Sequence, residues 1–122
     1  MADHGRTVLV VDDEAMLGEL MALSLEEHGY NVLLAHDGQV ALEMMRNSET
    51  DIVVTDFMMP RMNGLELARA IRSQQRYSDL PIILVSGIDG SIGREHPELF
   101  DAVLDRPHPP EALIEKVESV LA

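Results

Sequence analysis

The sequence contains no cysteine and no tryptophan, and aromatic residues make up only 3% of its 122 residues. Without cysteine, the chain can form neither a disulfide framework nor a cysteine-ligated zinc or iron–sulfur centre. With so few aromatic side chains, its core must consist of Val, Leu, Ile, Ala and Met. Because 46% of the residues are hydrophobic and 25% are charged, the composition is that of a soluble globular protein able to bury a core unaided.

Basic residues are also scarce: 9 Lys and Arg face 22 Asp and Glu, which gives a net charge of −13. A field of that sign repels nucleic-acid phosphates and anionic membranes, so we expect neither as a direct partner. The polar N-terminus "MADHGR" is not followed by a long apolar run. We therefore expect no signal peptide and no membrane-spanning helix, and a location in the cytoplasm.

Short apolar runs alternate with helical patterns along the whole chain, which predicts one domain over residues 1–122 with residues 1–6 flexible. The expected strands cover residues 7–11, 31–35, 51–55, 81–86 and 102–105. Leu17, Leu20, Met21 and Ser24 fall at helical spacing in the first helix, and Asp37 can cap the second. The fourth helix can only be short, near residues 97–101. Five such units predict an α/β fold, a doubly wound, flavodoxin-like (βα)5 parallel sheet with a short or irregular fourth helix.

Charged and hydroxyl side chains follow four of the predicted strands. Their positions are Asp12, Asp13, Asp56, Ser86 and Arg106. Because the carboxyl ends of parallel strands meet at one edge of the sheet, we expect these side chains to lie close together. Each alone has an ordinary explanation: an aspartate can cap a helix or form a turn, a serine can cap a loop, and an arginine can lie on the surface.

Together these residues suit phosphoryl transfer. Three clustered carboxylates favour Mg²⁺, which takes oxygen ligands and often binds beside a phosphate. A carboxylate there can act as the nucleophile toward phosphorus, while the hydroxyl and the guanidinium hold phosphoryl oxygens. None of the five histidines has a partner at metal-ligand spacing, so we interpret them as surface or core residues: His4, His28, His36, His96 and His108.

Four segments resemble the receiver domain of bacterial two-component response regulators, chemotaxis regulators in particular. They are "VVDDE", "DIVVTDFMMPRMNG", "PIILVSG" and "RP", and the aspartate followed by "MPxMxG" is a specific signature. The resemblance implies that Asp56 is phosphorylated and that Asp13 binds Mg²⁺ directly. It further implies that Asp12 acts through water, that Met58 offers a backbone carbonyl, and that Ser86 is the switch hydroxyl.

The resemblance also implies the partners. The phosphodonor would be a histidine kinase or a histidine phosphotransfer protein, and the output a downstream protein or an attached domain. The protein would be no enzyme beyond Mg²⁺-dependent self-phosphorylation and autodephosphorylation. The Arg106–Pro107 bond would be cis.

Several positions depart from the family on its signalling face. Arg106 replaces a lysine, Val103 an aromatic switch residue, and His108 the usual hydrophobic residue after the proline. We therefore hypothesise that phosphorylation reorders residues 87–97 instead of rotating an aromatic ring. A second hypothesis is that Met58 and Ile88 exclude water and lengthen the phosphoryl lifetime, unless both side chains point elsewhere.

Three other kinds of protein share features with this sequence. A flavodoxin-like electron carrier would need a glycine- and hydroxyl-rich phosphate loop where this chain has "DDEAM". A phosphatase with an aspartyl nucleophile would need a second acid at Met58. The third alternative, a receiver-like binding module that is not phosphorylated, has some support from Arg106 and Val103.

Overall fold

The computed structural model describes residues 5–87 and 91–122. Its strands are β1 (Thr7–Val11), β2 (Asn31–Ala35), β3 (Ile52–Asp56), β4 (Ile82–Ser86) and β5 (Ala102–Asp105). Its helices are α1 (Ala15–Glu27), α2 (Gly38–Asn47), α3 (Gly64–Arg72), the 3₁₀ helix η1 (Gln75–Tyr77), α4 (Ser91–Arg94) and α5 (Pro110–Leu121). The predicted alternation of strands and helices is confirmed, including the cap on α2, where the Asp37 carboxylate accepts the Val40 amide at 2.8 Å.

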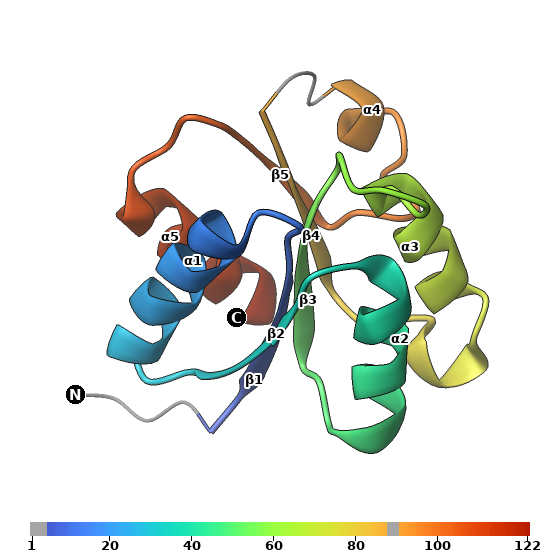
Figure 1. Cartoon of the computed structure of the whole chain (residues 1–122), viewed down its shortest axis with the longest axis horizontal. Helices are drawn as coiled ribbons and strands as arrows, with labels where there is room; N and C mark the ends of the chain where they lie inside the picture. Colours follow the sequence, from blue (N-terminus) through green and yellow to red (C-terminus); the bar gives the residue numbers. More distant parts are fainter. Residues whose placement is uncertain (1–4, 88–90) are drawn as a thin grey trace.

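The five strands form one parallel sheet in the order β2-β1-β3-β4-β5. Helices α1 and α5 cover one face, and α2, α3 and α4 cover the other (Figure 1). The chain turns from one side of β1 to the other between β2 and β3, so the strand order reverses next to β1 and β3. In such doubly wound sheets, sites form beyond the carboxyl ends of the strands at this reversal.

Two apolar layers hold the helices to the sheet because successive strand residues point to opposite faces. Leu9, Val53 and Leu84 lie in the layer beneath α2 and α3, whereas Val10 and Ile83 lie in the layer beneath α1 and α5. The central strands β3 and β4 are buried along their full length. This burial on both faces makes them continuous apolar runs and anchors their last residues, Asp56 and Ser86, rigidly at the rim.

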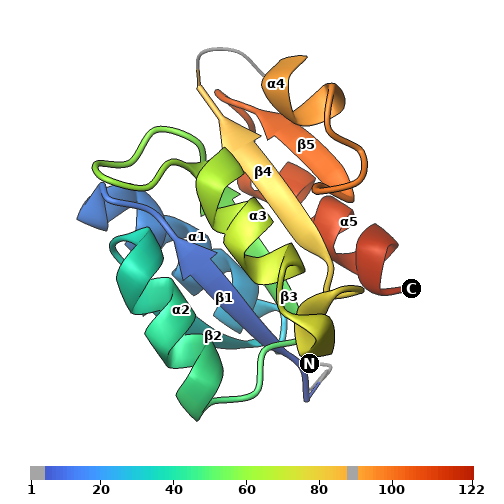
Figure 2. The same cartoon turned by 90° about the vertical axis from the view of Figure 1, so that its right-hand side faces the viewer.

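The fourth helix is short, as predicted, but its predicted position is wrong. Helix α4 is one turn at Ser91–Arg94, on the edge of the sheet beside β5 (Figure 2). Residues 97–101 form turns instead, in which the His96 carbonyl accepts the amides of Leu99 and Phe100. Both of these side chains are buried in the core, and this tertiary anchoring overrides the local helical pattern.

Helical spacing alone does not show which residues of α1 are buried, since Leu20 is 55% exposed. Helix α1 instead packs Gly18, Met21 and Leu25 against the sheet. A methyl group on Gly18 would lie 2.9 Å from Leu34 Cδ1, so the glycine sets a close approach that turns Leu20 outward. Among the described residues, no helix is both long and apolar enough to cross a membrane.

Candidate functional site

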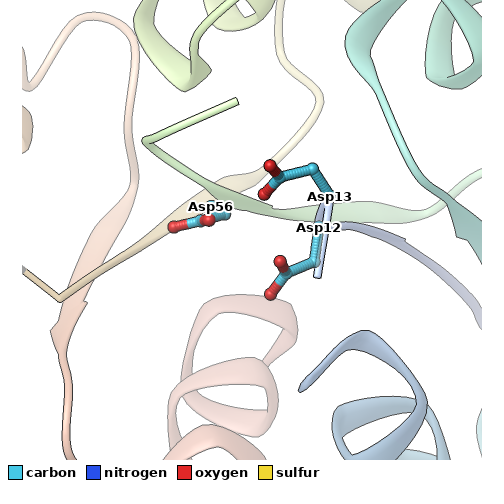
Figure 3. A group of neighbouring side chains, drawn as sticks. All are labelled: Asp12, Asp13 and Asp56. Carbon is cyan, nitrogen blue, oxygen red and sulfur yellow. The ribbon is translucent and has the colours of Figure 1, made fainter. Parts of the chain in front are cut away.

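Three carboxylates meet at the carboxyl edge of the sheet. Asp12 and Asp13 follow β1, and Asp56 ends the neighbouring strand β3; the three side chains lie around one small space (Figure 3). One oxygen from each carboxylate lies within 4.8 Å of the other two. The parallel pairing of β1 with β3 brings Asp56 beside Asp12 and Asp13, which lie far from it in the sequence. The predicted proximity of the three carboxylates is therefore confirmed.

Asp12 is the buried member of the cluster, with an exposed fraction of 0%. Its amide donates to the Ala35 carbonyl at 3.1 Å, which extends the β1–β2 ladder by one residue. Its Oδ1 accepts the Glu14 amide at 2.9 Å. Helix α1 starts at Ala15 with Glu14 in the N-cap position and no side-chain cap, so neither Asp12 nor Asp13 is its N-cap. The ordinary helix-cap explanation of these aspartates does not hold.

Asp56 is 5% exposed and accepts the Phe57 amide on Oδ1 at 2.8 Å. Burial, followed by repulsion from Asp12, raises the pKa of the Asp56 carboxyl to about 6, although Arg106 and the Phe57 amide oppose the increase. The carboxylate is thus destabilised by its surroundings in the metal-free state. A cation in addition to Arg106, close to the Asp56 carboxylate, would offset both the burial and the repulsion from Asp12.

Arg106 reaches into the cluster with both terminal nitrogens. Its Nη2 donates to Asp12 Oδ2 at 2.7 Å, and its Nη1 lies 3.5 Å from Asp56 Oδ1. Its backbone amide donates to the Ser86 carbonyl at 2.8 Å, and the following bond, Arg106–Pro107, is cis. The sequence predicts Arg106 near Asp56 but not its shorter bond to Asp12, because no local sequence signal indicates a contact across 94 positions.

The other predicted site residues lie around this cluster. Ser86 ends β4, beside β3, and is 3% exposed. The Met58 side chain is 56% exposed, and its role as a carbonyl ligand remains a prediction. Ile88 lies outside the described residues, as does part of the 87–97 segment, so the lifetime and loop-reordering hypotheses also remain predictions.

The described histidines lie outside the carboxylate cluster. His28 and His36 are exposed, and His96 and His108 are partly exposed; His4 lies outside the described residues. The His36 Nδ1 is 3.3 Å from the Asp12 backbone carbonyl, a contact that leaves the carboxylate untouched. Of the two interpretations, surface or core, these four histidines follow the first.

The donor set fits a hard divalent cation. All three groups are carboxylates, their oxygens are close enough to share one ion, and one of them is fully buried beside a second buried acid. Mg²⁺ prefers oxygen ligands and keeps part of its water shell, which the exposed side of Asp13 allows. A single guanidinium cannot neutralise three carboxylates, so the cluster retains negative charge to attract the ion.

Comparison with known proteins agrees with this geometry. The family model for the response regulator receiver domain matches residues 8–118. The chain belongs to the response regulator receiver domain family. This receiver domain is 39% identical over 117 residues to response regulator MprA of Mycobacterium ulcerans, covering 93% of the chain and 49% of MprA. It is 32% identical over 123 residues to the phosphate regulon regulatory protein PhoB of Pseudomonas aeruginosa, covering 96% of the chain and 52% of PhoB. The chain thus spans about half the length of these relatives.

Solved structures support the same fold. The chemotaxis response regulator CheY4 of Vibrio cholerae superposes with a TM-score of 0.87 at 30% identity, covering 95% of this chain and 98% of that one. The response regulator TrrA of Thermotoga maritima, solved in complex with Mg²⁺ and BeF, gives a TM-score of 0.85 at 32% identity, covering 95% and 99%. The predicted flavodoxin-like fold is confirmed. Receiver domains are signalling modules, which sets this chain apart from electron carriers and phosphatases.

An apolar groove adjoins the acidic cluster of this receiver domain. It has a volume of about 570 Å³ and lies between α1 and the start of α5, with Leu17, Leu20 and Leu23 on one wall and Pro107 and Leu113 on the other. Arg106 and Gly87 also line it, so the groove ends at the site. Leu23 is 54% exposed, and Met16, on the same helix, is still more exposed. The α1 side of the domain therefore presents apolar surface directly beside the carboxylates.

On another face of the receiver domain, α4 packs closely over β5. A methyl group on Gly93 of α4 would lie 2.6 Å from Val103 Cγ2 and 2.7 Å from Leu84 Cδ2, so the glycine lets α4 pack tightly over β5. An aromatic side chain at position 103 would not fit beneath α4 in this arrangement. The small Val103 side chain, which replaces the family's aromatic residue, therefore allows the close packing of the short helix α4.

Proposed function

We propose that this receiver domain accepts a phosphoryl group on Asp56 from a histidine kinase or a histidine phosphotransfer protein. The observation that carries this proposal is the buried Asp56 carboxylate within a three-carboxylate cluster that also receives a guanidinium. Such a site concentrates negative charge where a cation and a phosphoryl group can bind together. We further propose that the protein acts in the bacterial cytoplasm, in line with the family.

In this proposal Asp13, Asp12 and Asp56 hold Mg²⁺, with Asp12 acting through a water molecule and Met58 contributing its backbone carbonyl. Bound there, Mg²⁺ would neutralise phosphoryl charge and orient the phosphoryl oxygens toward Asp56. The residues of the chain supply the rest. The Phe57 amide orients the Asp56 carboxylate through a 2.8 Å hydrogen bond, leaving the other oxygen, Oδ2, as the nucleophile.

The transfer step is a displacement at phosphorus. One Asp56 oxygen forms a new P–O bond while the P–N bond of the phosphohistidine breaks, and the electron pair stays on the imidazole nitrogen. With acetyl phosphate as donor, the P–O bond to acetate breaks instead. Arg106 and Ser86 would bind the phosphoryl oxygens and stabilise the charge that develops on them.

We propose the groove between α1 and α5 as the docking surface of the phosphodonor. It joins the acidic cluster through Arg106, so a partner seated on Leu20 and Leu23 would reach Asp56 without rearrangement. The apolar surface suits an amphipathic helix of the donor. Glu19, Glu26 and Glu27 on the same helix are exposed and would favour a basic rim on the donor.

The test is intact-mass spectrometry after incubation with acetyl phosphate and MgCl₂. We expect a mass increase of one phosphoryl group in the native chain, lost with EDTA and lost in Asp56→Asn. Asp79→Asn, an exposed aspartate in the loop before β4, is the matched control and should retain the increase. An unmodified native chain under these conditions would instead support the alternative of a receiver-like binding module that is not phosphorylated.

A companion experiment tests the docking surface. Leu20→Ser combined with Leu23→Ser should slow phosphorylation by a histidine phosphotransfer protein but leave acetyl phosphate modification unchanged. Val40→Ser, at an exposed apolar position of α2, is the control and should affect neither reaction. Equal loss with both donors would show that the serines disturb the site itself.

A further inference from the structure

We propose that Arg106 is a built-in competitor for the divalent cation: its guanidinium bridges Asp12 and Asp56 in the metal-free domain, and metal binding displaces it from Asp12. This inference rests on the proposed function, because it concerns the same site. It assigns to Arg106 a step before phosphorylation, namely the control of metal affinity. In this role Arg106 is a positioning residue acting on the metal ligands.

The strength of the bridge lies on the Asp12 side. The 2.7 Å contact from Nη2 to Asp12 Oδ2 is a short, charge-assisted hydrogen bond, whereas the 3.5 Å contact from Nη1 to Asp56 Oδ1 is at the limit of bonding. The Arg106 side chain is 17% exposed and the Asp12 side chain is 0% exposed, so water screens this pair little. The principal partner of Arg106 is therefore Asp12, not the phosphoacceptor.

Both oxygens of Asp12 are already engaged. Oδ1 accepts the Glu14 amide at 2.9 Å, and Oδ2 accepts Arg106. A cation or its bound water that uses Asp12 must take a remaining lone pair beside these two donors or replace the guanidinium. Sharing would place a divalent and a monovalent positive charge side by side in a poorly solvated pocket, which their repulsion disfavours. Displacement of Nη2 is the outcome that relieves this repulsion.

The bridge depends on the shape of arginine. A guanidinium presents two terminal nitrogens in a rigid plane, so it can contact two carboxylates at once. A lysine at position 106 carries the same charge on a single, shorter-reaching nitrogen. Arg106→Lys therefore separates the effect of the bridge from the effect of charge, which no neutral substitution can do.

The exposed Arg94 offers a matched control. It pairs with Asp105, the residue before Arg106, at 2.5 Å, and both side chains are more than half exposed. Removing its charge changes the field around the site but none of the contacts within it. An effect seen with Arg106 variants and not with Arg94→Gln would therefore come from the bridge.

The experiment is isothermal titration with MgCl₂ at fixed ionic strength, using the full chain. We expect Arg106→Lys to bind Mg²⁺ roughly three- to tenfold more tightly than the native chain, the factor that one net hydrogen bond is worth. Arg106→Gln should bind more tightly still, provided that circular dichroism shows it to be folded. Arg94→Gln should stay within about twofold of native, as expected for an exposed charge. Native-like or weaker binding by folded Arg106→Lys would overturn the inference.

A second readout needs no variant. In the ¹⁵N spectrum of the native chain, the guanidinium signal of Arg106 should shift on Mg²⁺ addition with the same dissociation constant as calorimetry gives. An Arg106 signal that does not respond while Mg²⁺ binds would overturn the inference, yet leave the proposed function standing if acetyl phosphate still modifies Asp56. Absence of Mg²⁺ binding at millimolar concentrations would overturn both.

Discussion

The acidic rim and the α4–β5 face of this receiver domain are held in place by different kinds of contact. At the rim, Asp12 and Asp56 are buried at strand ends and fixed by backbone amides. On the α4–β5 face, a single helical turn rests on the side chain of Val103 and on an exposed ion pair from Arg94. Chemistry that needs fixed distances is placed on the buried strand ends, and the face that departs from the family pattern is held by side-chain packing and one exposed ion pair.

One core side chain connects the two regions. Leu84 on β4 is fully buried; a methyl group on Gly64 would lie 3.1 Å from its Cδ1, and one on Gly93 would lie 2.7 Å from its Cδ2. Gly64 also lies against the backbone of Asp56, so Leu84 supports the rim through Gly64 and α4 through Gly93. Substitutions at these two glycines therefore compare the two regions directly.

The largest effect is expected from Gly64→Ala. The new methyl group would lie 2.5 Å from the Asp56 carbonyl oxygen and 3.0 Å from Phe57 Cα, and backbone atoms at a strand end cannot move aside cheaply. We expect a loss of about 3 kcal/mol in the free energy of unfolding, measured by urea denaturation. Any folded fraction should be phosphorylated more slowly by acetyl phosphate. A free energy of unfolding equal to that of the native chain would show that the backbone at the rim can move to accept the methyl group.

Asp56→Asn should increase the free energy of unfolding, whereas Gly64→Ala should decrease it. Burial and Asp12 raise the pKa of Asp56 from its usual 3.8 to about 6, so the folded chain holds this proton more tightly than the unfolded chain does. The stability from this carboxyl is complete below about pH 4 and is lost as the pH rises through 6. In EDTA at pH 7.5 the variant should therefore be more stable than native by roughly 1 to 2 kcal/mol, a value reduced for solvent screening.

The pH series supplies the control for this prediction. The difference between Asp56→Asn and the native chain should shrink as the pH is lowered from 7.5 to 4, because the Asp56 carboxyl of the folded native chain is then protonated and uncharged, like the asparagine. Saturating MgCl₂ at pH 7.5 should also shrink or reverse it, since only the native carboxylate can hold the ion. A difference that stays constant with pH would show that the charge on Asp56 is not its cause.

Gly93→Ala should be milder than Gly64→Ala. Its methyl group meets only side-chain atoms, of Val103 and Leu84, which can shift by a few tenths of an ångström. We expect a loss of about 1 kcal/mol in urea denaturation, since overpacking is partly offset by the better helix propensity of alanine. Acetyl phosphate modification should be native. In the Leu84→Ala background the loss should fall, because one of the two close contacts is gone.

The smallest effect is expected from Arg94→Gln. The Arg94–Asp105 pair is exposed on both sides, and exposed pairs contribute at most about 1 kcal/mol. We expect the free energy of unfolding to change by less than about 0.5 kcal/mol. High salt screens the pair in the native chain, so the difference between the variant and the native chain should then disappear. A larger loss would mean that this pair, rather than side-chain packing, holds α4 on β5.

Most of the fold could be predicted from periodicity, because continuous apolar runs such as those of β3 and β4 are long enough to be unambiguous. The position of α4 could not, since the segment between β4 and β5 has no clear periodicity, and the burial of Leu99 and Phe100 from turns depends on tertiary contacts. The exposure of Leu20 could not be predicted either. Periodicity identifies an apolar side of a helix, but the close contact at Gly18 decides which residues of that side face the sheet.

The sequence by itself determined the family and the residues that stand at the carboxyl edge, because three aspartates, a serine and an arginine lie at or directly after the ends of the strands. Only the tertiary structure decided how the arginine divides its two nitrogens between Asp12 and Asp56. The physical reason is that an ion pair between buried side chains depends on distances set by the packing of three strands. Residues 94 positions apart carry no local signal of those distances.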